Sequence, residues 1–148
     1  MTTIQNSAHF ELVDYRDLYN KAQHDFAKLN NLVNSYDLFN FLCTVNHIHD
    51  WAKKDIQLSG VTLPDNRTGK LNIVRQLCNR AKHFKKGQGS PDTTVKKGWG
   101  TGRYGVGKWG IGEPSYTVTA DGQEVSVLEI CKDALTEWES FIAQNPSK

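Results

Sequence analysis

The sequence predicts a mainly α-helical protein, a four-helix bundle with a small Gly-rich β excursion between the third and fourth helices. Four segments carry apolar residues at alternating steps of three and four, the spacing of an amphipathic helix. Between the last two of them, residues 87–112 hold nine of the twelve glycines, and an Asp121-Gly122 pair marks a tight turn. Because 148 residues is the usual size of one domain, we expect residues 1–148 to form a single helical domain with a Gly/aromatic-rich insert over residues 87–125.

The first two helices are predicted from long apolar stripes. The first helix is expected over residues 8–30, with polar side chains on its other faces. Asn34 and Ser35 offer an N-cap for the second, which is expected over residues 35–55. Apolar residues lie on most sides of this second helix, so we expect it to be central. The first stripe consists of Leu12, Tyr15, Tyr19, Ala22, Phe26, Leu29 and Val33.

The second half of the chain is predicted from caps and turns as well as periodicity. A third helix over residues 68–86 would end at Gly87. Residues 115–120 are typical of a strand, and residues 123–125 of a short return strand that completes a β-hairpin. The fourth helix is expected over residues 127–144, opened by a capping box of Ser126 and Glu129.

Charge is spread unevenly along the chain. The net charge is +2, but the stretch from Arg80 to Lys108 holds eight Lys or Arg and a single acid, Asp92. A basic segment on an otherwise acidic body indicates an anionic partner, and the alternative is a solvated basic loop. No secretory signal and no long apolar run is present, so we expect a cytoplasmic protein without a membrane contact.

The cysteines and the missing nucleotide motifs argue against a cofactor. The three cysteines are far apart in the sequence and lie in apolar patterns, which predicts buried thiols rather than a disulfide framework. Cys43, His47 and Asp50 fall nearly on one helix face but suggest no fourth ligand, so no metal site is expected. The chain has no P-loop or dinucleotide fingerprint, and we expect no cofactor.

A five-residue repeat is the clearest chemical signal. Each unit reads aromatic, Gly, β-branched, Gly, charged, and the units begin at Trp99, Tyr104 and Trp109. Aromatic faces stack on unpaired bases, while cations neutralise phosphates. The alternative is a Gly-rich arm whose aromatic side chains fold back onto the helices. The residues expected to contact nucleic acid are Lys96, Lys97, Trp99, Arg103, Tyr104, Lys108 and Trp109.

A second group of polar residues follows one face of the third helix. Asn72, Gln76, Asn79 and His83 are mostly uncharged, whereas a solvated face usually carries charges. The functional hypothesis is a polar site at a cleft or partner, and the alternative is plain solvation. The catalytic candidates are His83, Asp50, Arg75, Arg80 and Lys82.

Two short motifs carry a resemblance to known proteins: Asn79-Arg80-Ala81-Lys82-His83-Phe84 and, earlier, His49-Asp50-Trp51. Here the chain resembles small helical proteins of bacteria and phages that are distantly similar to the HEPN superfamily. The resemblance implies a helical bundle. Many HEPN proteins are ribonucleases with an Arg and a His four to six residues apart on one helix. Arg75 and Arg80 are separated from His83 by seven and two residues, so neither spacing matches.

These observations give one leading functional hypothesis and two alternatives. The leading one is a non-enzymatic accessory or interaction protein that binds single-stranded nucleic acid, another anionic partner or a partner protein, with the basic Gly/aromatic arm as the binding segment. The first alternative is a metal-independent HEPN-like ribonuclease in which His83 is the general base and Arg80 or Lys82 stabilises phosphate charge. The second is a protein-binding immunity or anti-defence factor. The sequence does not specify the oligomeric state.

Overall fold

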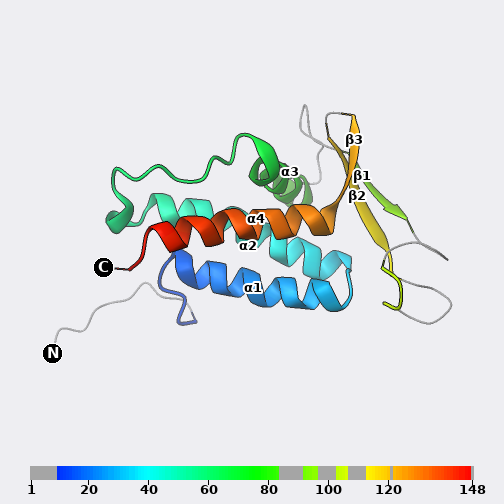
Figure 1. The fold of residues 1–148 in the computed structure, drawn as a ribbon, viewed down its shortest axis with the longest axis horizontal. Coiled ribbons are helices and arrows are strands. Elements are labelled where there is room, and N and C mark those ends of the chain that lie inside the picture. Colours follow the sequence, from blue (N-terminus) through cyan, green and yellow to red (C-terminus); the bar gives the residue numbers. More distant parts are fainter. Residues whose placement is uncertain (1–9, 84–91, 97–102, 107–112, 121, 148) are drawn as a thin grey trace.

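Helices make up most of the structure, and a small sheet lies at one end of them (Figure 1). The structure is a computed structural model that describes residues 10–83, 92–96, 103–106, 113–120 and 122–147. Within these residues the elements are α1 (Tyr15–Asn31), α2 (Ser35–Lys53), the short 3-10 helix η1 (Ile56–Leu58), α3 (Gly69–His83), β1 (Asp92–Lys96), β2 (Ser115–Ala120), β3 (Gln123–Ser126) and α4 (Val127–Gln144). The mainly helical class with a small sheet is therefore confirmed.

Helix α1 begins later than the predicted residue 8, because Asp14 caps it. The Asp14 carboxylate accepts hydrogen bonds from the backbone N–H groups of Arg16 (2.9 Å) and Asp17 (3.2 Å). The Asp17 carboxylate accepts in return from the Asp14 N–H at 3.1 Å, which completes a capping box. Phe10 and Glu11 have positive φ angles of 56° and 66°, so the chain just before this cap is not helical.

The other helix boundaries follow the sequence more closely. Asn34 caps α2 as predicted, through its side-chain oxygen and the Asp37 N–H, and α4 spans the predicted residues 127–144. The predicted capping box of α4 is wrong, because Ser126 stands at the N-cap but its side chain makes no capping hydrogen bond. Helix α2 ends two residues early, and the predicted residues 84–86 of α3 lie outside the described residues.

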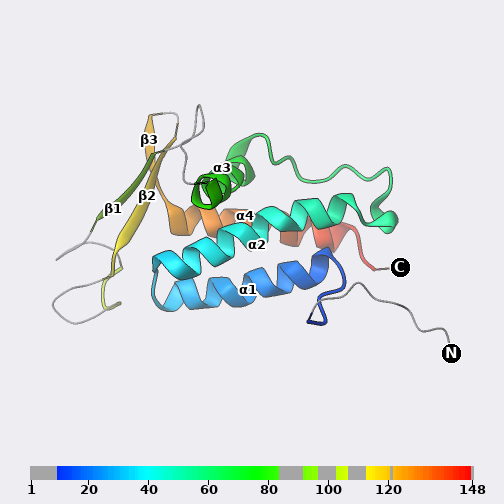
Figure 2. The ribbon, with the colours of Figure 1, turned by 180° about the vertical axis from the view of Figure 1, so that it is seen from behind.

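Three of the helices lie alongside one another. In Figure 1 and, from behind, in Figure 2, α1, α2 and α4 run side by side, whereas α3 is seen almost end-on and crosses them. Each of these three contacts the other two, and α3 packs on α2 and α4. The predicted arrangement of all four helices as a four-helix bundle is therefore not confirmed. None of the described helices has the length and apolar content that a membrane crossing requires.

Trp138 of α4 is the centre of the core. Its side chain is fully buried, and its ring lies 5.6 Å from that of Phe141 and 6.4 Å from that of Tyr15 in α1. The ring of His49 in α2 meets it edge-on at 6.4 Å. Because an aromatic side chain buries a large apolar area, this cluster ties α1, α2 and α4 together.

The sheet is antiparallel, with the strands in the order β1-β2-β3. Val118 of β2 is fully buried, and Tyr116 and Ala120 on the same face pack against the helical core. Gly122, at φ +76°, makes the predicted tight turn between β2 and β3. Strand β1 pairs with β2 from Asp92↔Thr119 to Lys96↔Ser115.

The two N-caps offer a matched test of helix capping. Asp14→Ala removes two hydrogen bonds to the first turn of α1 and should lower the free energy of unfolding by about 1 kcal/mol. Ser126→Ala, at an N-cap that makes no side-chain hydrogen bond, should change it much less. Urea unfolding followed by circular dichroism measures both. Equal losses in the two variants would contradict this account of where α1 begins.

Candidate functional site

The insert between α3 and α4 is fixed to the helices by an ion pair. Arg103 and Glu113 come ten residues apart, at the charged position of the first and third units of the five-residue repeat. The guanidinium donates to the Glu113 carboxylate through Nε (2.9 Å) and Nη2 (2.6 Å). This two-point geometry is the strongest that an arginine and a carboxylate can adopt.

The same ion pair also joins the end of α1 to the start of α2. Arg103 donates to the carbonyl oxygens of Leu29, at 2.9 Å, and Asn30, which belong to the last turn of α1. Glu113 accepts from the backbone N–H of Val33 at 3.0 Å, between the two helices. The final carbonyls of a helix lack partners within the helix and carry its negative dipole end, so an arginine is stabilising there.

Glu113 needs these contacts because it is buried. Its relative exposure is 2%, and an ionised carboxylate at such a place is costly unless it is paired. Burial by itself would raise the pKa of Glu113, but the hydrogen bonds from Arg103 and from the Val33 N–H outweigh it and hold the pKa below its ordinary value of 4.5. The hydrogen bond to Glu113 raises the pKa of Arg103. Both groups are therefore charged at neutral pH.

Tyr104, the next residue after Arg103, is exposed to solvent, in contrast to the buried Glu113. Its side chain is fully exposed, and Gly105 follows in a left-handed conformation at φ +76°. In β1, Thr93, Thr94 and Val95 are also exposed. Arg103 thus holds this stretch against the helices while its neighbour presents an aromatic ring to solvent.

The predicted nucleic-acid contacts are described only in part. Arg103 is engaged with Glu113 and the α1 carbonyls, which gives it a structural role that the sequence did not indicate. Tyr104 is exposed as binding requires. Lys97, Trp99, Lys108 and Trp109 lie outside the described residues, as does the side chain of Lys96. Their role stays a prediction.

The catalytic candidates are not brought together by the described contacts. Arg75 is occupied locally, with hydrogen bonds to the Asn66 carbonyl (3.2 Å) and the Asn72 side chain (2.8 Å). Asp50 is exposed, and Arg80 is half-buried. The side chains of Lys82 and His83 lie outside what the structure describes.

The contacts between α2 and α3 indicate how the two helices pass each other. Cys78, late in α3, contacts Asn46 of α2, while His49 lines a small cavity with Leu71, early in α3. Later residues of α2 thus lie against earlier residues of α3. In the described stretches, no group of three or more His, Cys, Asp or Glu is placed to hold a metal ion.

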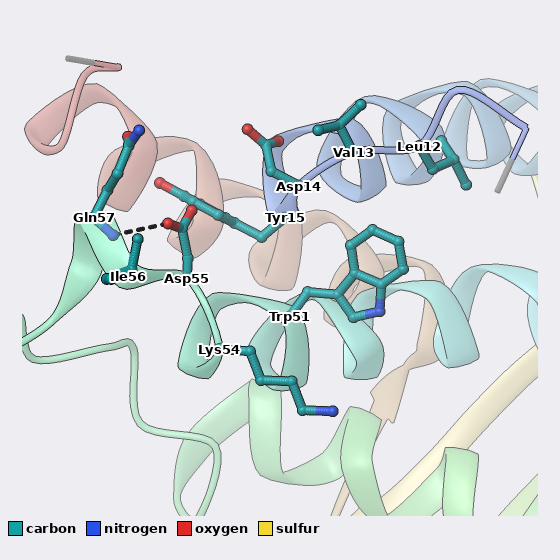
Figure 3. A pocket seen from close by; sticks show the side chains of 9 residues that line it. All are labelled: Leu12, Val13, Asp14, Tyr15, Trp51, Lys54, Asp55, Ile56 and Gln57. Carbon is teal, nitrogen blue, oxygen red and sulfur yellow. Dashed lines mark hydrogen bonds between the residues drawn. The ribbon is translucent and has the colours of Figure 1, made fainter. Parts of the chain in front are cut away.

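An open groove of about 590 Å³ lies at the other end of α1, between the segment before it and the end of α2 (Figure 3). Trp51 forms part of its wall, with Tyr15 and the residues that follow α2. Val13 and Ile56, which line it, are exposed. The sequence did not single out this groove, because its residues come from two stretches of the chain that are more than 30 positions apart, residues 12–15 and 51–57.

Comparison with protein-family models, with curated proteins and with solved structures gives no match for this chain. The resemblance to HEPN proteins therefore stays a prediction.

The lowered pKa of Glu113 predicts how its stabilising effect depends on pH. Glu113→Gln keeps the size of the side chain but loses its charge, which should cost about 1–3 kcal/mol of unfolding free energy at pH 7. The folded-state pKa lies below 4.5, so the unfolded chain binds more protons as the pH falls through this range. The advantage of the wild type should therefore be complete above pH 4.5 and shrink below it.

Urea titrations of the two proteins at neutral and acidic pH measure this difference. Convergence of the two unfolding free energies in acid supports an ionised, paired Glu113. A difference that stays constant down to the lowest pH would show that the charge of Glu113 does not matter.

Proposed function

We propose that this protein is a non-enzymatic binding protein that holds single-stranded nucleic acid on the insert between α3 and α4. The observation that carries the proposal is the contrast between Arg103 and Tyr104. The Arg103 guanidinium is hydrogen-bonded to the Glu113 carboxylate and to carbonyl groups at the end of α1. The ring of the adjacent Tyr104 is fully exposed. An exposed ring on a stretch anchored to the protein body is suited to stacking against a base.

The charge of the insert supports the same partner. Even with Arg103 paired to Glu113, the stretch from Arg80 to Lys108 keeps seven other Lys or Arg and one acid, Asp92. Positive charge beside aromatic residues is the combination found where proteins bind single strands without strong sequence preference. The repeated glycines carry no side chain, so a nucleic-acid backbone can approach the chain closely.

Binding should show two separable contributions, from stacking and from charge. We expect the wild type to bind a fluorescent single-stranded oligonucleotide at low salt, with an affinity that falls linearly with salt on a log–log plot. Tyr104→Ala should weaken binding by ~1–3 kcal/mol, the value of one stacked base. Lys97→Ala should instead reduce the salt slope by ~0.7, as expected for one lost phosphate contact on a single strand. Fluorescence anisotropy at two salt concentrations measures both effects.

The matched control is Phe10→Ala. Phe10 is also a strongly exposed aromatic residue, but it precedes the start of α1, whereas the insert is anchored at the end of α1. Its loss should leave binding unchanged. A wild type that binds neither RNA nor DNA at low salt contradicts the proposal, and so does an equal effect of Tyr104→Ala and Phe10→Ala. Shortening of the RNA during the titration would favour the ribonuclease hypothesis instead.

The groove near Trp51 favours a second candidate, a protein-binding module. Large exposed apolar side chains beside a groove are typical of a surface that a protein partner covers. Ile56 and Val13 meet this description. Ile56→Asp separates the two candidates, because it alters the groove and should leave nucleic-acid binding by the insert intact.

A further inference from the structure

Two cysteine side chains from different helices meet where α2 packs on α3. The Sγ atoms of Cys43 and Cys78 are 3.2 Å apart, although the residues are 35 positions apart in the sequence. A disulfide bond needs a separation of about 2 Å, so a small adjustment of two side chains brings the sulfurs within bonding distance. All three cysteines of the chain are present as thiols.

The surroundings of the pair give the two sulfurs different access. Cys43 is half-buried and can be reached from solvent, whereas Cys78 is fully buried behind it. The side-chain amide of Asn46, one turn after Cys43, donates to the Cys78 sulfur at 3.8 Å. This contact and the one to Cys43 Sγ hold the Cys78 sulfur at the helix interface, directed at its partner.

The third cysteine differs from this pair in its expected reactivity. Cys131 of α4 is fully buried, and burial raises the pKa of its thiol well above the ordinary value. Because thiolates react with oxidants and buried neutral thiols do not, Cys131 should stay reduced in the folded protein.

We propose that Cys43 and Cys78 are a peroxide-responsive thiol pair that forms a reversible disulfide between α2 and α3. The Cys43 thiolate attacks one oxygen of hydrogen peroxide, the O–O bond breaks, and the products are a Cys43 sulfenic acid and hydroxide. The Cys78 sulfur then attacks the Cys43 sulfur and displaces the sulfenic oxygen as hydroxide. The protons released by the two thiols convert both hydroxides to water. Two thiols lose two electrons, and one peroxide is reduced to two waters.

The disulfide would add a covalent connection between two helices that pack against each other. Linking residues this far apart restricts the unfolded chain, so the oxidised protein should be more stable. Reduction by a small dithiol reverses the step. The bond also fixes the second half of α3, the helix that leads into the insert.

Peptide mapping after oxidation tests the pair directly. The purified full chain is treated with hydrogen peroxide, alkylated under denaturing conditions, digested and analysed by mass spectrometry without reduction. We expect one peptide pair joined through Cys43 and Cys78, and alkylated Cys131. The melting temperature should rise by ~5–15 °C on oxidation and return after dithiothreitol.

Two single variants distinguish the roles of the two sulfurs. In Cys78→Ser the sulfenic acid at Cys43 has no resolving thiol, so dimedone should label Cys43. In Cys43→Ser the buried Cys78 should stay reduced, and oxidation should not change the melting temperature. Cys131→Ala is the matched control and should form the same Cys43–Cys78 link as the wild type. Wild-type protein in which peroxide leaves Cys43 and Cys78 alkylated, or links either of them to Cys131, overturns the proposal.

Discussion

The buried carboxylate of Glu113 is the constraint on which the position of the insert depends. A charged group that is 2% exposed must be paired, and the nearest cation comes from the same Gly-rich stretch, ten residues earlier. By supplying it, Arg103 places its guanidinium against the last carbonyls of α1, while Glu113 accepts the Val33 N–H before α2. One ion pair therefore joins residues 103 and 113 within the insert, satisfies carbonyl groups at the end of α1 and connects the start of β2 to the helices.

This constraint gives the repeat a structural role beside the binding role that we propose for it. Two of its charged positions, Arg103 and Glu113, are used internally, and the aromatic residue beside the first of them, Tyr104, is left to solvent. A loop that must hold a ligand gains from such anchoring, because less conformational entropy is lost on binding. The proposed thiol pair lies at a different place, where α2 contacts α3, the helix that precedes the insert.

The spacing of apolar residues and the turn signals predicted those elements whose bounds depend on neighbouring residues in the sequence. The 127–144 helix and the 115–120 strand have the bounds that their stripes and turn signals indicate. The start of α1 was missed because the apolar stripe begins at Leu12, whereas the Asp14 cap decides where the backbone becomes helical. The pairing of Arg103 with Glu113 could not be predicted from the sequence. The glycines between them allow many backbone conformations, so the sequence does not indicate that the two side chains meet. The crossing of α3 likewise results from packing between distant segments and not from its own sequence.

The central claim is that Arg103 and Glu113 stabilise the protein as a pair, and a double-mutant cycle tests it most directly. Arg103→Ala, Glu113→Ala and the double variant are compared with the wild type by urea unfolding. We expect each single change to cost about 3 kcal/mol and the double change clearly less than their sum, because removing both partners leaves no unpaired buried charge. The exposed pair of Lys70 and Asp133, at 4.0 Å, is the control and should show almost no coupling. Additive losses for Arg103 and Glu113 would contradict the account.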